Sequence, residues 1–193
     1  MNNEVNLSGC ITSDFQYSHE LYGEKFYSVT LSVKRSSGVM DLIPLLVSEK
    51  IVDVNKILAG SYVFVRGGFR SYNQHDVDKN RVKVYVFVDS IELITNDNNI
   101  NDVFLEGFIC KTPTYRHTPL GREVSDVTLA VNRAYNKSDY IPCILWGRNA
   151  YAVRSLQAGE SIRVSGRIQS RQYNKNGEVK TAYELSVNLM ELC

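Results

Sequence analysis

The sequence is poor in the residues that build disulfides, metal sites and membrane spans. Its 193 residues include three histidines and four widely spaced cysteines, Cys10, Cys110, Cys143 and Cys193, with no Cys-x-x-Cys pair and no histidine close to a cysteine. This spacing predicts free thiols in a reducing cytoplasm, no metal site and no cofactor, and we expect Cys143 to pack in a core. No apolar run is longer than a strand, so we expect no signal peptide, no membrane span and a soluble, cytoplasmic protein.

Signals of catalysis are also missing. The segment VRGGFR, residues 65–70, contains a glycine pair, but it continues a strand pattern instead of opening a helix, as a phosphate-binding loop would. No Ser-His-Asp or Cys-His arrangement stands out, and His19 and His117 occupy equivalent loop positions, where a structural or phosphate-contacting role is expected. The sequence therefore predicts neither an enzyme nor a small-molecule substrate.

A strong charge of either sign is absent from the whole chain but not from its parts. The formal net charge is +1, yet residues 1–95 hold ten Lys and Arg against eleven Asp and Glu, or −1. Residues 101–193 hold twelve against nine, or +3, with Asp97 between the two halves. The direction of this difference favours the second half as the one that binds an anionic partner.

What the chain does contain is a tandem repeat. A shift of 98 residues aligns residues 3–44 with 101–142 without a gap, and the match resumes after one inserted residue. Identical pairs include Arg35 with Arg133, Asp41 with Asp139 and Gly67 with Gly166. We therefore predict a first domain at 1–95, a polar linker at 96–100 and a second domain at 101–193.

Each repeat has the apolar alternation of β-strands. The second repeat is predicted to form strands over residues 103–112, 123–133, 139–145, 161–173 and 179–191. One helix, predicted at 148–156, lies between the third and fourth strands, and EKIVDVNKIL, residues 49–58, is its counterpart in the first repeat. The expected fold is all-β: two tandem OB-folds, each a five-stranded Greek-key barrel with one short helix between strands 3 and 4.

Strand parity separates a core face from an outer face in the second repeat. Ile141, Cys143 and Leu145 point inward, which sends Tyr140 and Trp146 outward. Exposed rings stack nucleic-acid bases, and cations between them neutralise phosphates. The candidate nucleic-acid-binding residues of this repeat are Tyr135, Tyr140, Trp146, Tyr173, Arg116, Arg133, Lys137, Arg148, Arg163, Arg167 and Arg171. The same pattern is also typical of a protein interface, and a stacking surface does not separate DNA from RNA.

The first repeat differs at the matching positions. Tyr135, Tyr140 and Trp146 are replaced there by Ser37, Leu42 and Ser48, while Tyr173 persists as Tyr72. We expect a weaker binding site around Arg66, Arg70 and Tyr72. Apolar residues on a nominally outer face need cover, so we expect the following set to lie in an interface: Leu42, Tyr62, Phe64, Tyr85 and Phe87.

Several ordered segments of the second repeat, LEGFICKTPTYRHTPLGREVSDVTLAVNR, DYIPCILWGRNA and GRIQSRQYNKNGE, resemble the bacterial single-stranded DNA-binding protein family. The resemblance implies binding of single-stranded DNA without catalysis, with base-stacking positions at Tyr135, Tyr140, Trp146 and Tyr173. The first repeat looks like a diverged copy, recognisable mainly through LSGCI, SVTLSVKR and DLIPLLV. For a chain with two such domains, the resemblance implies a homodimer with four barrels in total. The family's flexible acidic tail is missing after VNLMELC, so recruitment of partners through that route is not expected.

The sequence is therefore consistent with two functions. The leading hypothesis is a non-catalytic bacterial or mobile-element protein that coats single-stranded DNA during replication, recombination or transfer. The alternative is a protein-interaction module similar to primosomal replication protein N, with DNA binding secondary and replication proteins as partners. A tight affinity for single strands that weakens with salt favours the first hypothesis.

Overall fold

The computed structural model describes residues 2–54, 56–76, 79–96, 98–175 and 177–193, and contacts divide the chain into two compact units. The first-repeat unit comprises residues 4–69 and 84–102, and the second-repeat unit comprises residues 1–3, 70–83 and 103–193. Over the described residues, no helix has both the length and the apolar character that a membrane span requires.

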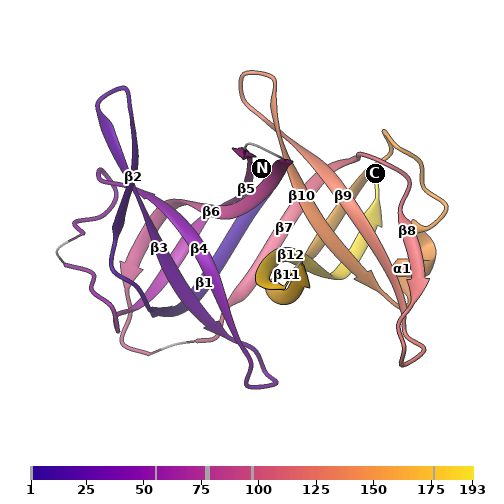
Figure 1. Ribbon diagram of the computed structural model, residues 1–193, viewed down its shortest axis with the longest axis horizontal. Coiled ribbons are helices and arrows are strands. Elements are labelled where there is room, and N and C mark those ends of the chain that lie inside the picture. The colour runs from indigo at the N-terminus through magenta and orange to yellow at the C-terminus, as the bar shows by residue number, and fades with distance from the viewer. Residues whose placement is uncertain (1, 55, 77–78, 97, 176) are drawn as a thin grey trace. The chain divides into compact units, whose positions relative to one another are not determined.

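The second repeat forms a closed five-stranded barrel with one additional strand (Figure 1). Neighbouring strands follow the order β7-β9-β10-β12-β11, and β7 pairs with both β9 and β11 to close the barrel. Only β10 and β12 pair in parallel among the described strand pairs of this repeat. The order is that of an OB-fold. The strands are β7 (Asn101–Ile109), β8 (Thr114–His117), β9 (Glu123–Arg133), β10 (Lys137–Trp146), β11 (Ser161–Lys175) and β12 (Glu178–Leu192).

The barrel core follows the parity expected from the sequence. Ile141, Cys143 and Leu145 on β10 are at most 3% exposed, and Ile162 and Ile168 on β11 are fully buried. Alternate residues of a strand point to opposite faces, so burial of this set fixes the outward direction of its neighbours. The prediction that Cys143 packs in the core is confirmed.

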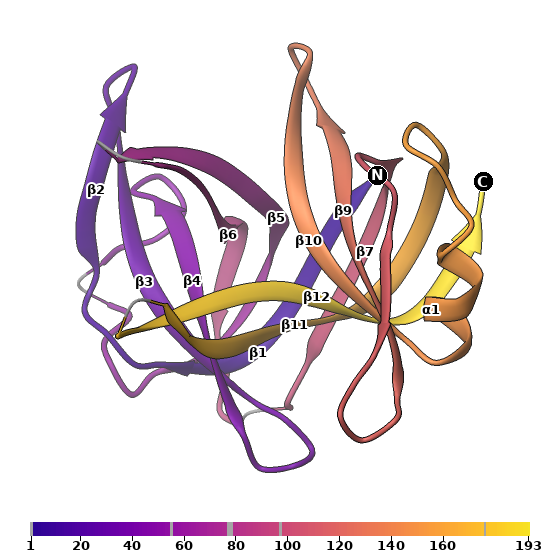
Figure 2. The ribbon, with the colours of Figure 1, turned by 45° about the vertical axis from the view of Figure 1, so that its right-hand side comes forward.

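Two local elements of the second repeat differ from the prediction. The helix α1 (Arg148–Val153) has six residues, ends three residues earlier than expected, and lies against β9, β10 and β12 (Figure 2). After it, the Leu156 N–H donates to the Val153 carbonyl at 3.1 Å, a turn that carries the chain toward Gly159. Strand β8 was not predicted, because four mostly exposed residues between Pro113 and Pro119 carry no apolar alternation.

The first repeat has the same strand order, β3-β4-β6-β5-β1, closed by pairing between β1 and β3. The predicted helix at 49–58 is not found: residues 49–54 and 56–58 form turns and irregular structure, and residue 55 lies outside the described residues. Three β-branched residues, Ile51, Val52 and Val54, lower the helix propensity of this short segment. The strands are β1 (Asn3–Ile11), β2 (Gln16–Leu21), β3 (Glu24–Lys34), β4 (Met40–Ser48), β5 (Tyr62–Asp76) and β6 (Lys79–Leu93).

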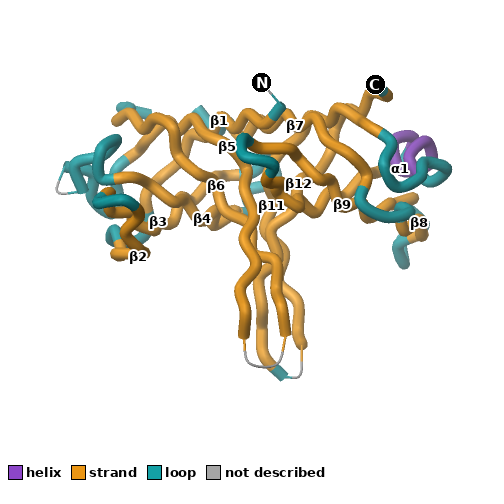
Figure 3. Tube along the Cα trace, turned by 90° about the horizontal axis from the view of Figure 1, so that it is seen from above, coloured by secondary structure: helices purple, strands orange, loops and turns teal. Residues whose placement is uncertain are grey.

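Gly166 of β11 is required by close backbone approach. A Cβ atom at Gly166 would lie 2.1 Å from the Ser186 carbonyl oxygen, and the strand register shifts between Ser165 and Gly166. The bulge adds twist as β11 and β12 continue side by side into a long hairpin (Figure 3). The repeated glycine at position 67 meets the Phe87 carbonyl in the same way. The match between Gly67 and Gly166 therefore has a packing cause.

The two compact units do not follow the repeat boundary throughout. The described residues of the β5–β6 hairpin tip, 70–76 and 79–83, belong to the second-repeat unit, as do residues 2–3. Ser71 supplies two of these contacts, both to β10. Long hairpins leave backbone and side-chain groups beyond the barrel that need partners of their own. The domain limits at 95 and 101 therefore describe the sequence repeat, while the hairpin tip packs with the second repeat.

Candidate nucleic-acid interface

Strand β10 presents two aromatic rings on the face opposite the core. Tyr140 is 45% exposed and Trp146 is 37% exposed, while Ile141 and Leu145, which point the other way, are fully buried. The strand is held in this orientation by its full antiparallel register with β9, in which Tyr140 faces Ala130 and Trp146 faces Val124. The barrel core thus determines where the two rings lie.

This outer face continues across β12 onto β11. Ile144 of β10 pairs with Ser186 of β12, which pairs with Arg167 of β11. Residues that are direct partners in a sheet point to the same face. Arg167 therefore shares the face of Tyr140 and Trp146, as predicted from strand parity. On the other face, the matching row of Cys143, Leu185 and Ile168 is buried in the core.

Tyr135 lies at the tip of the turn between β9 and β10 and is 94% exposed. Its φ angle is 60°, and the following Asn136 has φ 55°. The left-handed region costs a residue with a Cβ atom about 1–2 kcal/mol, and glycine or asparagine would accommodate this turn at lower cost. Packing does not explain a fully exposed, strained tyrosine, so this side chain is a strong candidate for a ligand contact.

Tyr173 lies on the extended part of the β11–β12 hairpin, where it faces Lys180 and is 38% exposed. By strand alternation it follows Arg167 and Arg171 along the same face of β11. Gln169 and Glu184, which share this face, are buried and joined by a 2.8 Å bond from Gln169 Nε2 to Glu184 Oε1. The face is therefore a mixture of exposed rings and covered polar groups.

The cations of the predicted site fall into two classes. Four are already paired with carboxylates: Arg116 with Asp126 at 3.0 Å, Arg133 with Asp139 at 3.1 Å, Arg163 with Glu106 at 2.8 Å and Arg171 with Glu184 at 3.6 Å. The hydrogen bond from Arg163 to Glu106 raises the pKa of the Arg163 guanidinium further. Within the described part of the chain, Lys137, Arg148 and Arg167 form no ion pair. This second class has more charge available for phosphate.

The half-buried Arg133 and the buried Asp139 form an ion pair next to Tyr140. Asp139 is fully buried, and its Oδ2 lies 3.1 Å from Arg133 Nε without the alignment of a hydrogen bond. Burial raises the pKa of the Asp139 carboxyl, and the Ser71 N–H and the charges of Arg133 and Arg70 oppose that rise. In the first repeat, Arg35 instead donates two hydrogen bonds to the Asp41 carboxylate, at 2.6 and 2.5 Å. The repeated Arg-Asp pair is thus built differently in the two units.

The interface candidates of the first-repeat unit are partly exposed. Leu42 and Tyr62 are 47% and 42% exposed, while Phe64, Tyr85 and Phe87 are half-buried. Phe87 packs on the buried Phe26 with ring centroids 6.0 Å apart. Arg66 lies over the Phe64 ring, 5.3 Å from its centroid. Their alternation with the buried Val63, Val65, Val84, Val86 and Val88 agrees with the predicted outward direction.

Two features near the site were not predicted. Ser71 and Asp139 join the hairpin tip to β10, and the only signal in the sequence was that Asp139 matches Asp41 across the repeat. Arg154 lies 3.5 Å from the ring centroid of the exposed Tyr151 and also faces Tyr115. The i, i+3 spacing of Tyr151 and Arg154 on a predicted helix could have indicated this stacking.

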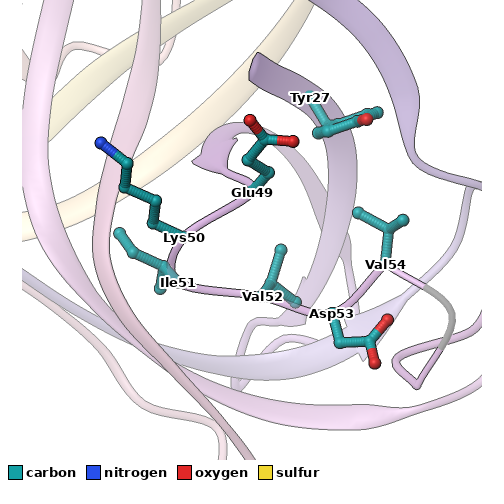
Figure 4. Close-up of a pocket in the computed structure, with 7 residues that line it drawn as sticks. All are labelled: Tyr27, Glu49, Lys50, Ile51, Val52, Asp53 and Val54. Atoms are coloured by element: carbon teal, nitrogen blue, oxygen red, sulfur yellow. The ribbon is translucent and has the colours of Figure 1, made fainter. Parts of the chain in front are cut away.

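An open pocket in the first-repeat unit is lined by Tyr27 and residues 49–54, the loop that replaces the predicted helix (Figure 4). Glu49 Oε1 accepts the Lys25 N–H at 3.0 Å, and Lys50 donates to Glu24 at 2.7 Å. Glu24 also accepts from the Ser48 hydroxyl, and these bonds lower the pKa of the Glu24 carboxyl. Glu24, Glu49 and Lys50 therefore have hydrogen-bond partners within their own repeat. Clusters of three or more side chains that could hold a metal ion are not found among the described residues.

The sequence of the second repeat matches a known protein family. The model of the single-strand binding protein family matches residues 100–193. Single-stranded DNA-binding protein B of Bacillus subtilis (strain 168) is 41% identical over 85 residues, which cover 40% of this chain and 75% of that protein. Single-stranded DNA-binding protein A of the same organism is 39% identical over 87 residues, covering 41% of this chain and 51% of that protein. The chain thus spans three quarters of one relative and about half of the other.

The fold has a counterpart in a solved structure. The wild-type single-stranded DNA binding protein from Thermus aquaticus superposes with a TM-score of 0.81 at 20% identity, covering 99% of this chain and 92% of that chain. At this identity the likeness concerns the fold alone, and it confirms the tandem OB-fold. The match to protein B rests on sequence identity over most of that relative's length. The chain therefore belongs to the single-strand binding protein family.

Proposed function

We propose that this protein binds single-stranded DNA without catalysis and coats it during replication, recombination or transfer. The observation that carries the proposal is the outer face of β10, where Tyr140 and Trp146 stand exposed over a buried core and share their face with Arg167. Rings bind bases by stacking, each worth about 1–3 kcal/mol, and a cation between them neutralises phosphate. The relatives named single-stranded DNA-binding proteins support the same activity.

The proposed contacts belong mainly to the second repeat, the domain at 101–193. Tyr135, Tyr140, Trp146 and Tyr173 would stack on bases, and Lys137, Arg148 and Arg167 would supply the main phosphate contacts. The paired arginines, Arg116, Arg133, Arg163 and Arg171, would contribute less, because a neighbouring carboxylate already offsets each charge. The proposal includes the cytoplasm as the place of action, where single-stranded DNA arises in bacteria.

Trp146 provides a direct test because it is the single tryptophan of the chain. Its fluorescence should be quenched to saturation on titration with a thymidine oligonucleotide, and the affinity should weaken as salt is raised. A duplex of the same length is the matched control and should quench much less. Absence of both quenching and a mobility shift would refute the proposal and assign Trp146 to a protein interface.

We also propose that two chains associate through the outer face of the first-repeat unit. Leu42 and Tyr62 expose apolar surface there, and surface of this kind is often covered by a partner. Light scattering should give twice the chain mass of 21.9 kDa, and the double variant Tyr62→Ser, Phe64→Ser should lower that mass. An unchanged mass for the variant would remove these residues from the interface.

A further inference from the structure

We propose that residues 70–72 of the first repeat, where β5 enters the hairpin tip, complete the DNA site of the second repeat and are held there by a clasp between Ser71 and Asp139. This inference rests on the proposed function and adds Arg70 and Tyr72 to the same surface. The prediction from sequence grouped these two residues with Arg66 in a separate, weaker site. Arg66 lies in the first-repeat unit, whereas Arg70 and Tyr72 lie in the second-repeat unit.

The clasp occupies an open edge of β10. In the described part of the chain, β10 pairs with β12 only over Cys143, Ile144 and Leu145, so its first half has no β12 neighbour. Ser71 bonds to this half twice: its N–H donates to Asp139 Oδ1 at 2.7 Å, and its Oγ accepts the Tyr140 N–H at 2.7 Å. The two reciprocal bonds position the hairpin directly beside a candidate stacking residue.

Burial makes the clasp costly to open. Asp139 is fully buried and Ser71 is 8% exposed, so water does not readily replace either bond. Opening the clasp would leave the Asp139 carboxylate with Arg133, whose Nε is 3.1 Å away but not aligned for a hydrogen bond. The charge of Arg70 also acts on the Asp139 carboxylate. The two Ser71 bonds and the charge of Arg70 thus hold this part of the hairpin on β10.

Tyr72 follows Ser71 directly and is 47% exposed, close to the 45% of Tyr140. Consecutive Cα atoms lie about 3.8 Å apart, so the Ser71 bonds bring the backbone of Tyr72 close to that of Tyr140. Two half-exposed rings whose backbones the Ser71 bonds bring close together, with the charge of Arg70 near Asp139, form the combination that binds successive nucleotides of a single strand. Asp139 and Ser71 are positioning residues in this arrangement, since neither needs to touch DNA.

The first experiment compares three tyrosine variants of the full chain in the oligothymidine titration. Tyr72→Ala and Tyr140→Ala should each weaken binding by about 5- to 150-fold, the precedent for one stacked base. Tyr17→Ala removes a 60% exposed tyrosine of the first-repeat unit and should leave affinity unchanged. Loss with Tyr140→Ala but not with Tyr72→Ala would overturn the inference and leave the proposed function intact. Absence of binding by the wild-type chain would refute the proposed function itself.

The second experiment tests the clasp. Ser71→Ala removes the acceptor for the Tyr140 N–H, so hydrogen exchange of that amide should become faster and DNA affinity should fall. Ser71→Thr retains a hydroxyl and should restore both. Because Ser71 acts through Tyr72 and Arg70, the loss of affinity in Ser71→Ala combined with Tyr72→Ala should be smaller than the sum of the two single losses. Faster exchange without loss of affinity, or fully additive losses in the double variant, would overturn the positioning role.

Discussion

The separation of paired from unpaired cations gives a quantitative prediction for Arg167→Gln. Arg167 shares a face with Tyr140 and Trp146 and forms no ion pair within the described residues. Loss of one phosphate contact to a single strand reduces the slope of log affinity against log salt by about 0.7. Between about 50 and about 200 mM salt, the difference in affinity between wild type and variant should therefore shrink by about 2.6-fold. Fluorescence titrations at four or more salt concentrations measure this slope.

The matched control removes a whole ion pair. Arg163→Gln combined with Glu106→Gln deletes two opposite charges that lie 2.8 Å apart and leaves the net charge unchanged. Its salt slope should equal that of the wild type, because the carboxylate already offsets the guanidinium. An unchanged slope for Arg167→Gln, or an equal loss of slope in the control, would refute the reasoning that pairing decides which arginines bind phosphate.

Three further predictions concern the scaffold. Gly166→Ala should lower the free energy of unfolding by roughly 1–3 kcal/mol or more, measured by urea denaturation, because its Cβ would lie 2.1 Å from the Ser186 carbonyl oxygen; wild-type stability would contradict the close approach. Burial raises the pKa of Asp139 above 3.8, so the folded state binds this proton more tightly than the unfolded state. Stability relative to Asp139→Asn should therefore increase as pH falls through the raised pKa, with the gain complete below 3.8, in parallel urea titrations; a gain with rising pH would show the opposite shift. Iodoacetamide should modify the exposed Cys193 much faster than Cys143, because burial blocks access to the Cys143 thiol and raises its pKa; equal rates by peptide mass spectrometry would be inconsistent with a closed core.

Most of the fold could be predicted because strand periodicity is a local property. The alternation of Ile141, Cys143 and Leu145 with polar or aromatic neighbours predicted both the β10 strand and its outward residues, and burial agrees. The helix at 49–58 was wrong because a few β-branched residues and the loop's own hydrogen bonds outweigh a weak helical pattern. Strand β8 is stabilised by pairing with β9, a contact that leaves little trace in four exposed residues.

The residues of the candidate site could be predicted from the sequence, but the pairing of its arginines with carboxylates could not. The positions of Tyr135, Tyr140, Trp146 and Tyr173 follow from parity and from the repeat, and all four are exposed. The availability of each arginine depends on a carboxylate that can be far away in sequence. Arg163 and Glu106 are 57 residues apart, and no spacing rule connects them. The set of site residues itself remains a prediction.

The sequence by itself determined the two barrels, their strand faces and the replacement of Tyr135, Tyr140 and Trp146 by Ser37, Leu42 and Ser48 in the first repeat. These features follow from side-chain periodicity and from direct comparison of one repeat with the other. Tertiary structure alone decided that the hairpin tip at 70–83 belongs with the second repeat. Ser71 and Asp139 lie 68 residues apart, and their bond forms because β10 leaves one edge open and a buried carboxylate there needs a donor.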